Sequence, residues 1–215
     1  MKKVLLNENV SLIFEFKFHI KFDTNNYDNY EDNYYVCLSS PIIYNEYNDT
    51  NDTEFEETIG YIEIWKVDGT RAINNHLDII DICDSIEQEL YEYASAIYKD
   101  GFIDEKLVEM PRSNDILILH RIEINKKYQG RKFGIIISEK IIEYLGYNCG
   151  AILIRPCPTQ FSDISKKNNW MDSYFSEKFS NKKSEGIKKL TQYWKKINSY
   201  TKPSNRKDII YIPQD

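Results

Sequence analysis

Residues 119–134 read LHRIEINKKYQGRKFG and join an apolar strand to a helix through a turn that contains glycine. The strand is predicted over residues 115–124, where apolar side chains dominate. The helix is predicted over residues 134–145, because Ile137 and Ile141 belong to an apolar stripe at helical spacing. Alternation of strands and helices predicts an α/β or α+β protein built on a central sheet.

Weaker patterns fill the rest of the chain. The acidic stretch 45–57 has few aliphatic residues and predicts a loop, and Asp68-Gly69 predicts a turn. No repeat or linker divides the sequence, so we expect one domain over residues 1–215, with flexible loops at 23–57 and 159–184. Further strands are expected over residues 10–22, 34–38, 58–67, 151–155 and 208–212, and further helices over 84–98, capped by Asp84, and 187–197.

Composition limits the functional class. The formal net charge of −6 argues against a protein that its overall field holds on nucleic acid. The four cysteines show no metal-ligand spacing, so we expect free thiols and no metal. No uninterrupted apolar segment approaches the ~20 residues of a membrane span or forms the apolar part of a signal peptide. We therefore expect a cytoplasmic protein with neither nucleic acid nor membrane as a partner.

The turn before the helix predicts an anion site. Gly130 and Gly134 permit tight backbone geometry and expose N–H groups that the helix start leaves unpaired. The positive end of the helix dipole adds to them, and Arg131 and Lys132 supply full charges where phosphates would lie. An ordinary tight turn is the alternative. Binding of a nucleotide is disfavoured, since no G-x-x-x-x-G-K-S/T pattern is present.

The same stretch resembles motif A of the GNAT N-acetyltransferases, Gln/Arg-x-x-Gly-x-Gly/Ala. Gln129 and Gly134 match its first and last positions, whereas Lys132 stands at the middle glycine and departs from the pattern. Residues 150–155 are similar to the family's strand five and residues 190–198 to its late helix. Residues 156–160 and the Tyr-Trp pair at 193–194 are similar to those of a poorly characterised bacterial subgroup.

This resemblance implies a GNAT fold, with a mixed, twisted sheet of about six or seven strands and helices on both sides. It implies that acetyl-CoA lies between strands four and five. The pantetheine arm would pair with the backbone near Ile122 and Ile124. The pyrophosphate would lie on the N–H groups of Gln129, Gly130, Arg131, Lys132, Phe133, Gly134 and Ile135.

Three residues are candidates for the chemistry that the resemblance implies. His120 and Glu123 are the possible general bases; His120 titrates near neutrality and shares the strand parity of Ile122, and a bulge would change these facings. A structural role for each is the alternative, with Glu123 paired to Arg121 or Arg155. Tyr193 is a candidate acid for the leaving thiolate, although the family's usual tyrosine position aligns with Trp194; the alternative for both is a role as core and cofactor-wall residues.

The sequence thus favours an acetyl-CoA-dependent N-acetyltransferase that transfers the acetyl group directly to a primary amine. The acceptor is an amine-bearing small molecule, peptide or protein, and a homodimer is possible. The alternative is a non-catalytic module of the same fold that binds CoA or a protein partner. Lys132 and the missing late tyrosine motivate that alternative.

Overall fold

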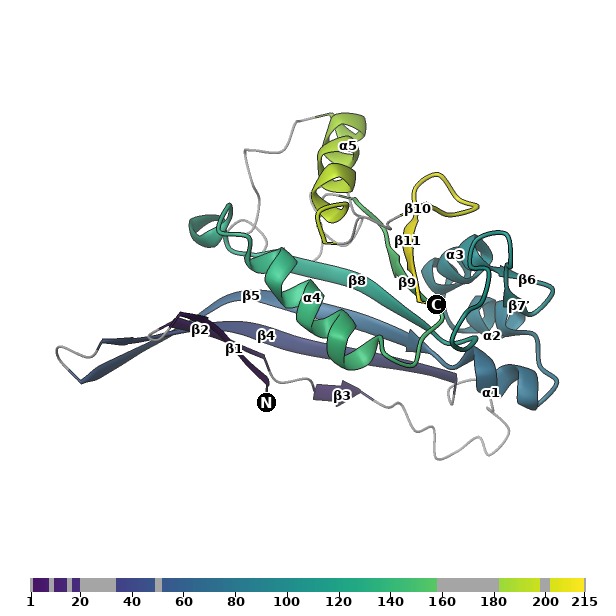
Figure 1. Cartoon of the computed structure of the whole chain (residues 1–215), viewed down its shortest axis with the longest axis horizontal. Helices are drawn as coiled ribbons and strands as arrows, with labels where there is room; N and C mark the ends of the chain where they lie inside the picture. The colour runs from purple at the N-terminus through teal and green to yellow at the C-terminus, as the bar shows by residue number, and fades with distance from the viewer. Residues whose placement is uncertain are drawn as a thin grey trace.

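The computed structural model describes residues 2–7, 10–14, 17–19, 34–48, 52–157, 182–197 and 202–214. Within them the chain forms an α+β structure in which one curled, mixed sheet is flanked by helices (Figure 1). Its strands are β1 (Lys2–Asn7), β2 (Val10–Phe14), β3 (Lys17–His19), β4 (Tyr35–Asn48), β5 (Thr53–Val67), β8 (Ile116–Ile124), β9 (Ala151–Ile154), β10 (Lys202–Pro203) and β11 (Ile210–Pro213).

The strand order is β1-β2-β4-β5-β8-β9-β11-β10, with β3 paired to β4. The pairing of β8 with β9 is parallel, and the other pairings in this sheet are antiparallel. Because parallel neighbours need a crossover connection, the chain between β8 and β9 forms helix α4 (Phe133–Leu145). A separate pair of two-residue strands, β6 (Tyr98–Lys99) and β7 (Phe102–Ile103), lies outside the main sheet.

The helices cover both faces of the sheet. Helix α4 and helix α5 (Lys183–Trp194) pack on one face, and Phe133 and Trp194 belong to the same core cluster, called here the α4 core. Helices α2 (Ile79–Ile86) and α3 (Gln88–Ile97) pack on the other, where Tyr93 belongs to the α3 core. Successive side chains of β8 alternate between the two cores: Leu117 belongs to the α4 core and Ile118 to the α3 core.

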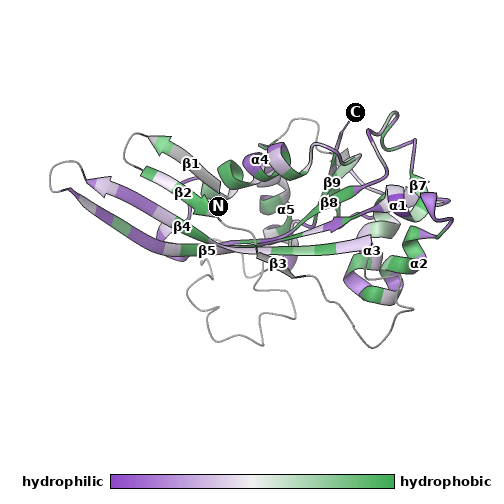
Figure 2. Ribbon diagram, turned by 90° about the horizontal axis from the view of Figure 1, so that it is seen from below, coloured by the Kyte–Doolittle hydropathy of each residue, from purple (hydrophilic) through white to green (hydrophobic). Residues whose placement is uncertain are grey.

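The prediction of a loop over residues 45–57 was wrong. Strands β4 and β5 form a long hairpin, and their pairs run out to Asn48 opposite Thr53. The outer part exposes side chains on both strands, as its mostly hydrophilic colouring in Figure 2 shows. With no buried face there, the sequence lacks the apolar alternation that reveals a strand, although backbone pairing continues the sheet.

Three boundaries also differ from the expectation. Asp68 does not make a simple turn: its carboxylate accepts the backbone N–H of Arg71 and caps a short helix, α1 (Gly69–Asn74). The helix expected over 84–98 is two helices, and Asp78 rather than Asp84 caps the first of them. The expected helix over 187–197 begins earlier, at Lys183. The flexible loops expected at 23–57 and 159–184 were wrong where the structure describes these residues, since 35–48 and 53–57 are strand and 183–184 are helix; residues 23–33 and 159–181 lie outside the described residues.

Candidate functional site

A bulge in β8 sets the arrangement of the candidate site. Glu63 of β5 pairs with Arg121 and Trp65 pairs with Ile118, so one residue of β5 faces both Leu119 and His120. The extra residue changes which side chains share a face. His120 stacks on Trp65 in the α3 core, whereas Ile122 packs against the α4 core. The expected shared facing of His120 and Ile122 was therefore wrong.

His120 lies between two carboxylates. Its Nε2 is 3.7 Å from Glu63 Oε1 and its Nδ1 is 3.9 Å from Glu89 Oε1, while the imidazole ring stacks on Trp65 with 3.6 Å between ring centroids. Its side chain is only 6% exposed. Burial, reinforced by the charges of Arg121 and Arg155, lowers the pKa of His120 to about 3. A histidine is expected to titrate near neutrality, and that expectation was wrong for His120. With its pKa lowered in this way, the imidazole is a weak proton acceptor.

Glu123 is buried on the same side of the sheet. Its side chain is 2% exposed, and among the described residues neither carboxylate oxygen has a hydrogen-bond partner. The nearest cation is Arg121, whose Nε lies 3.6 Å away; the alternative pairing with Arg155 does not occur. Burial raises the pKa of Glu123 against the lowering effect of Arg121. A carboxylate with a raised pKa suits a general base, so Glu123 is the stronger candidate of the two.

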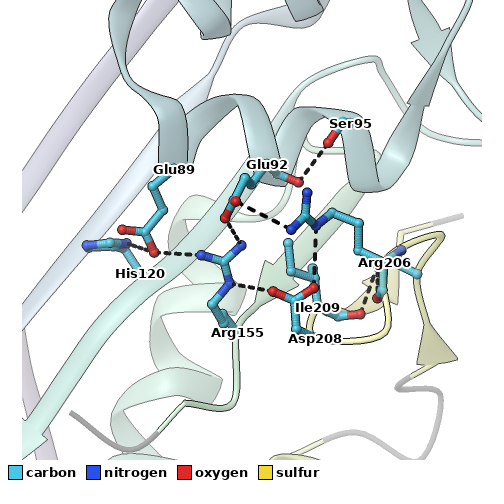
Figure 3. Close-up of polar contacts among 9 residues, drawn as sticks. Glu89, Glu92, Ser95, His120, Arg155, Arg206, Asp208 and Ile209 are labelled. Atoms are coloured by element: carbon cyan, nitrogen blue, oxygen red, sulfur yellow. Dashed lines mark hydrogen bonds and ion pairs between the residues drawn. The ribbon is translucent and has the colours of Figure 1, made fainter. Parts of the chain in front are cut away.

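Arg155, which directly follows β9, joins this site to helix α3. Its guanidinium contacts Glu89 Oε1 at 3.0 Å, Glu92 Oε2 at 2.7 Å and Asp208 Oδ2 at 3.2 Å. Figure 3 shows Glu89 between His120 and Arg155, so that one carboxylate oxygen faces both. Arg206 contacts Glu92 and Asp208 from the other side. The network fixes the end of β9 against α3 and against the turn before β11.

Strands β8 and β9 separate beyond Leu119 and Ile154. Their pairing ends at Leu119 opposite Ile154, whereas β8 continues to Ile124. The chain after Ile154 enters the Arg155 network, and Pro156 has no N–H with which to extend the ladder. Within the described residues, the last five residues of β8 therefore have β5 on one edge and no paired strand on the other.

The backbone of Ile122 and Ile124 is directed to that open edge. The N–H of Asn125 donates to Ile59 O in β5, and backbone groups of successive residues alternate between the two edges. The groups of Ile124 and Ile122 therefore point away from β5. The carbonyl of Ile124 accepts a hydrogen bond of 2.8 Å from Gln129 Nε2, which ties the following loop to the strand.

The loop before α4 has the geometry of an anion site. Gly130 has φ 87° and Lys132 has φ 64° with ψ 12°, so lysine holds the left-handed conformation that a glycine adopts more readily. Helix α4 begins directly after Lys132, with no side-chain cap and no acidic residue in its first turn. Arg131 and Lys132 are exposed beside this positive helix end. The positive-φ turn, the uncapped helix start and the exposed charges are thus present together, whereas the N–H groups of Gln129 and Ile135 already donate to the carbonyls of Lys126 and Lys132.

Tyr193 is separated from the other two candidate catalytic residues. It packs against the α4 core beside the backbone of Ile135, and burial raises its pKa. His120 lies on the α3 side of the sheet. Trp194 is 8% exposed and belongs to the α4 core, as the alternative for that residue expected. Tyr193 therefore lies beside the start of α4, near Gly134, rather than beside His120 and Glu123.

Glu63 and Glu89 are the site residues that sequence reasoning missed. Glu63 is an acidic residue in the apolar part of β5, and Glu89 precedes the apolar residue Leu90 in α3. Glu63 stands between Ile62 and Ile64 in β5, and an acidic residue among apolar neighbours could have indicated a functional side chain. No local pattern indicates that Glu89 meets β8.

Among the described residues, no group of three or more His, Cys, Asp or Glu side chains is arranged to hold a metal ion. No described helix has both the length and the apolar character that crossing a bilayer requires. Comparison with protein-family models, curated proteins and solved structures finds no match to this chain.

Proposed function

We propose that this chain is an acetyl-CoA-dependent N-acetyltransferase of the GNAT type. The main support is the parting of the parallel strands β8 and β9 directly beside an uncapped, positively charged helix start. An unpaired strand edge suits an extended amide-containing arm, and a helix N-terminus suits a pyrophosphate. The resemblance of residues 119–134 to motif A supports the same assignment.

In this proposal the chain has two binding roles and one catalytic role. The open edge of β8 at Ile122 and Ile124 pairs with the pantetheine amides, and the loop at 129–135 binds the pyrophosphate. Glu123 accepts a proton from the ammonium group of the acceptor, and the neutral amine nitrogen then attacks the thioester carbonyl carbon. A C–N bond forms, the C–S bond breaks, and the second proton lost by the nitrogen goes to the leaving thiolate, so that CoA departs as a free thiol.

Titration calorimetry with acetyl-CoA tests the binding part. Arg131→Glu places a negative charge beside the loop and is expected to weaken binding at least about tenfold. Lys99→Glu changes charge by the same amount at an exposed site in β6 and is expected to change the affinity less than about twofold. Failure of the wild-type chain to bind acetyl-CoA would overturn the proposal.

Release of free thiol in the presence of an amine tests the catalytic part. Glu123→Gln is expected to lower kcat/KM by about a hundredfold or more and to leave acetyl-CoA affinity within about twofold. Equal kcat/KM in wild type and Glu123→Gln would remove Glu123 from the mechanism.

A second candidate is a non-catalytic module that binds CoA. The position of Tyr193, beside the loop before α4 and away from His120, favours it, since this candidate acid does not stand beside the proposed base. Acetyl-CoA binding without thiol release on any amine tested would support this second candidate.

A further inference from the structure

The outer end of the hairpin formed by β4 and β5 projects from the body of the sheet (Figure 1). Strand β2 pairs with β4 only as far as Glu46, and the pairing of β8 with β5 ends at Gly60. Among the described residues, 47–48 and 52–56 therefore form a two-stranded ribbon with no third strand, called here the acidic arm. Such a ribbon is marginally stable in water unless another surface packs against it.

The acidic arm exposes both carboxylates and aromatic rings. Asp52, Glu54 and Glu56 are exposed, and the residues of the arm include no lysine or arginine. Tyr47 is 40% and Phe55 49% exposed. Aromatic rings bind ammonium groups over their faces, and they also pack against the apolar stems of lysine side chains. The surface of the arm therefore suits a partner that presents a row of lysines.

Helix α5 presents such a row. Four exposed lysines share one helix face, because two adjacent pairs lie seven residues apart along α5 and its C-terminal turn. The residues of this lysine face are Lys188, Lys189, Lys195 and Lys196. The opposite face of the helix packs Leu190 and Trp194 against the α4 core. Glu185 is the one acidic residue within α5 and contacts Lys182 at 3.7 Å, so no described carboxylate forms an ion pair with the lysine face.

The two surfaces are complementary but do not meet within one molecule. The acidic arm and α5 lie apart in both Figure 1 and Figure 2. The lysine face extends about 10 Å from Lys188 to Lys195, and the carboxylates from Asp52 to Glu56 extend over up to about 13 Å, so the rows are of similar length. A nucleic acid on the lysine face would be repelled by the acidic arm and by the net charge of −6. A second copy of the chain supplies the opposite charge for both surfaces.

We propose that the chain forms a symmetric dimer in which the acidic arm of each copy packs on the lysine face of the other. A two-fold axis makes the contact reciprocal, so that both arms and both lysine faces are covered and the assembly closes. Tyr47 and Phe55 lose exposed apolar surface in this contact, while the ammonium groups compensate the carboxylates beside them. The dimer does not depend on the proposed acetyl transfer.

Sedimentation velocity of the full chain tests the dimer. We expect a dimer at about 50 µM protein and about 50 mM salt, with a dimer Kd that rises at least about tenfold in about 0.5 M salt, where surface charges are screened. Reversing two charges on the arm (Glu54→Lys with Glu56→Lys) is expected to raise Kd at least about tenfold. The matched control, Glu105→Lys with Glu109→Lys, makes the same change at exposed sites outside the arm and is expected to raise Kd less than about twofold.

A mixture of two reversed chains tests whether the arm and the lysine face meet each other. Lys188→Glu with Lys189→Glu is expected to raise Kd as the arm variant does, because each variant alone brings like charges together. In a 1:1 mixture of the two, every contact again joins opposite charges. We therefore expect a heterodimer with a Kd within about threefold of the wild-type value. Circular dichroism of each variant checks that it is folded.

Several outcomes overturn the dimer. They are a wild type that stays monomeric at about 200 µM, an assembly larger than a dimer, and a 1:1 mixture that stays monomeric although both variants are folded. A monomeric wild type that binds heparin through the lysine face also overturns it and assigns that face to a polyanion. Acetyl-CoA titrated into the same samples tests the proposed function separately, since neither surface contains a residue assigned to acetyl transfer.

Discussion

Lys132 holds a conformation that its side chain makes unfavourable. At φ 64° it lies in the left-handed region, at the position before α4 where the GNAT motif has glycine. The surrounding loop enforces this conformation: Gly130 also has positive φ, and the N–H groups of Ile135 and Ile136 both donate to the Lys132 carbonyl. A charged residue is thereby placed at the helix start at some expense of stability.

Lys132→Gly is expected to unfold at higher urea concentration than Lys132→Ala. Alanine keeps the left-handed strain and glycine removes it, so we expect a difference of about 1 kcal/mol in the free energy of unfolding. Lys189, an exposed residue within α5, is the matched control, since there glycine is expected to be less stable than alanine by about the same amount. A glycine variant at Lys132 less stable than the alanine variant contradicts the strain.

The buried imidazole of His120 predicts a dependence of stability on pH. Its folded-state pKa of about 3 is below the unfolded value, so its contribution to stability is present above about pH 6.5 and is lost as pH falls toward 3. The raised pKa values of Glu89 and Glu123 act in the opposite direction, so the comparison must be made with a variant of His120 alone.

We expect His120→Gln to lose about 2 kcal/mol less than the wild type between pH 7.5 and pH 5.0. Urea unfolding of both proteins at four or five pH values in this window measures the difference. Parallel stability curves would show that His120 takes up its proton in the folded state as readily as in the unfolded chain.

At the scale of elements, α4 and α5 meet at one crowded point. A Cβ atom on Gly134 would lie 2.8 Å from the Tyr193 hydroxyl oxygen and 3.8 Å from the nearest ring carbon. The hydroxyl adjoins the backbone of Ile135 there. Glycine at this position therefore permits the late helix to rest on the start of α4, in addition to any approach of a phosphate.

Gly134→Ala is expected to destabilise the wild type by about 1–2 kcal/mol, because the new methyl group displaces the Tyr193 hydroxyl. In a Tyr193→Phe background the obstructing oxygen is gone, and the higher helix propensity of alanine is expected to make the same change neutral or stabilising. A double-mutant cycle by urea unfolding measures the coupling. Additive effects in the cycle would place the crowding elsewhere.

At the scale of the whole molecule, one sheet serves two cores. Strand β8 sends Leu117 and Leu119 into the α4 core, and Ile116 and Ile118 into the α3 core. Apart from the two-residue strands β6 and β7, which contribute Tyr98 and Ile103 to the α3 core, neither core has a second sheet among the described residues. Loss of β8 therefore removes packing contacts from both cores at once. We therefore expect the two cores to unfold together.

The tryptophans provide a reporter for each core. Trp65 lies in the α3 core and Trp194 in the α4 core, while Trp170 lies outside the described residues. In a Trp170→Phe background, removing Trp194 or Trp65 by substitution with phenylalanine leaves one reporter. We expect fluorescence and circular dichroism of each variant to give the same urea midpoint. Separate transitions within either variant would mean that the two cores unfold independently.

Local patterns were sufficient for the central elements. Apolar residues in β8, the helical stripe of α4 and the glycines between them predicted strand, turn and helix within one residue of their observed bounds. The anion-site prediction rests on the same neighbouring residues, because a helix start and its preceding loop are made by local backbone geometry. The hairpin of β4 and β5 was missed where both of its faces are polar.

The sequence by itself thus determined the strand–turn–helix stretch and the charges beside it. The tertiary structure alone decided what surrounds His120: the bulge that turns it toward Trp65, the approach of Glu89 from α3, and the burial that lowers its pKa to about 3. These properties come from pairing register and from contacts between residues far apart in the chain. No window of neighbouring residues contains that information.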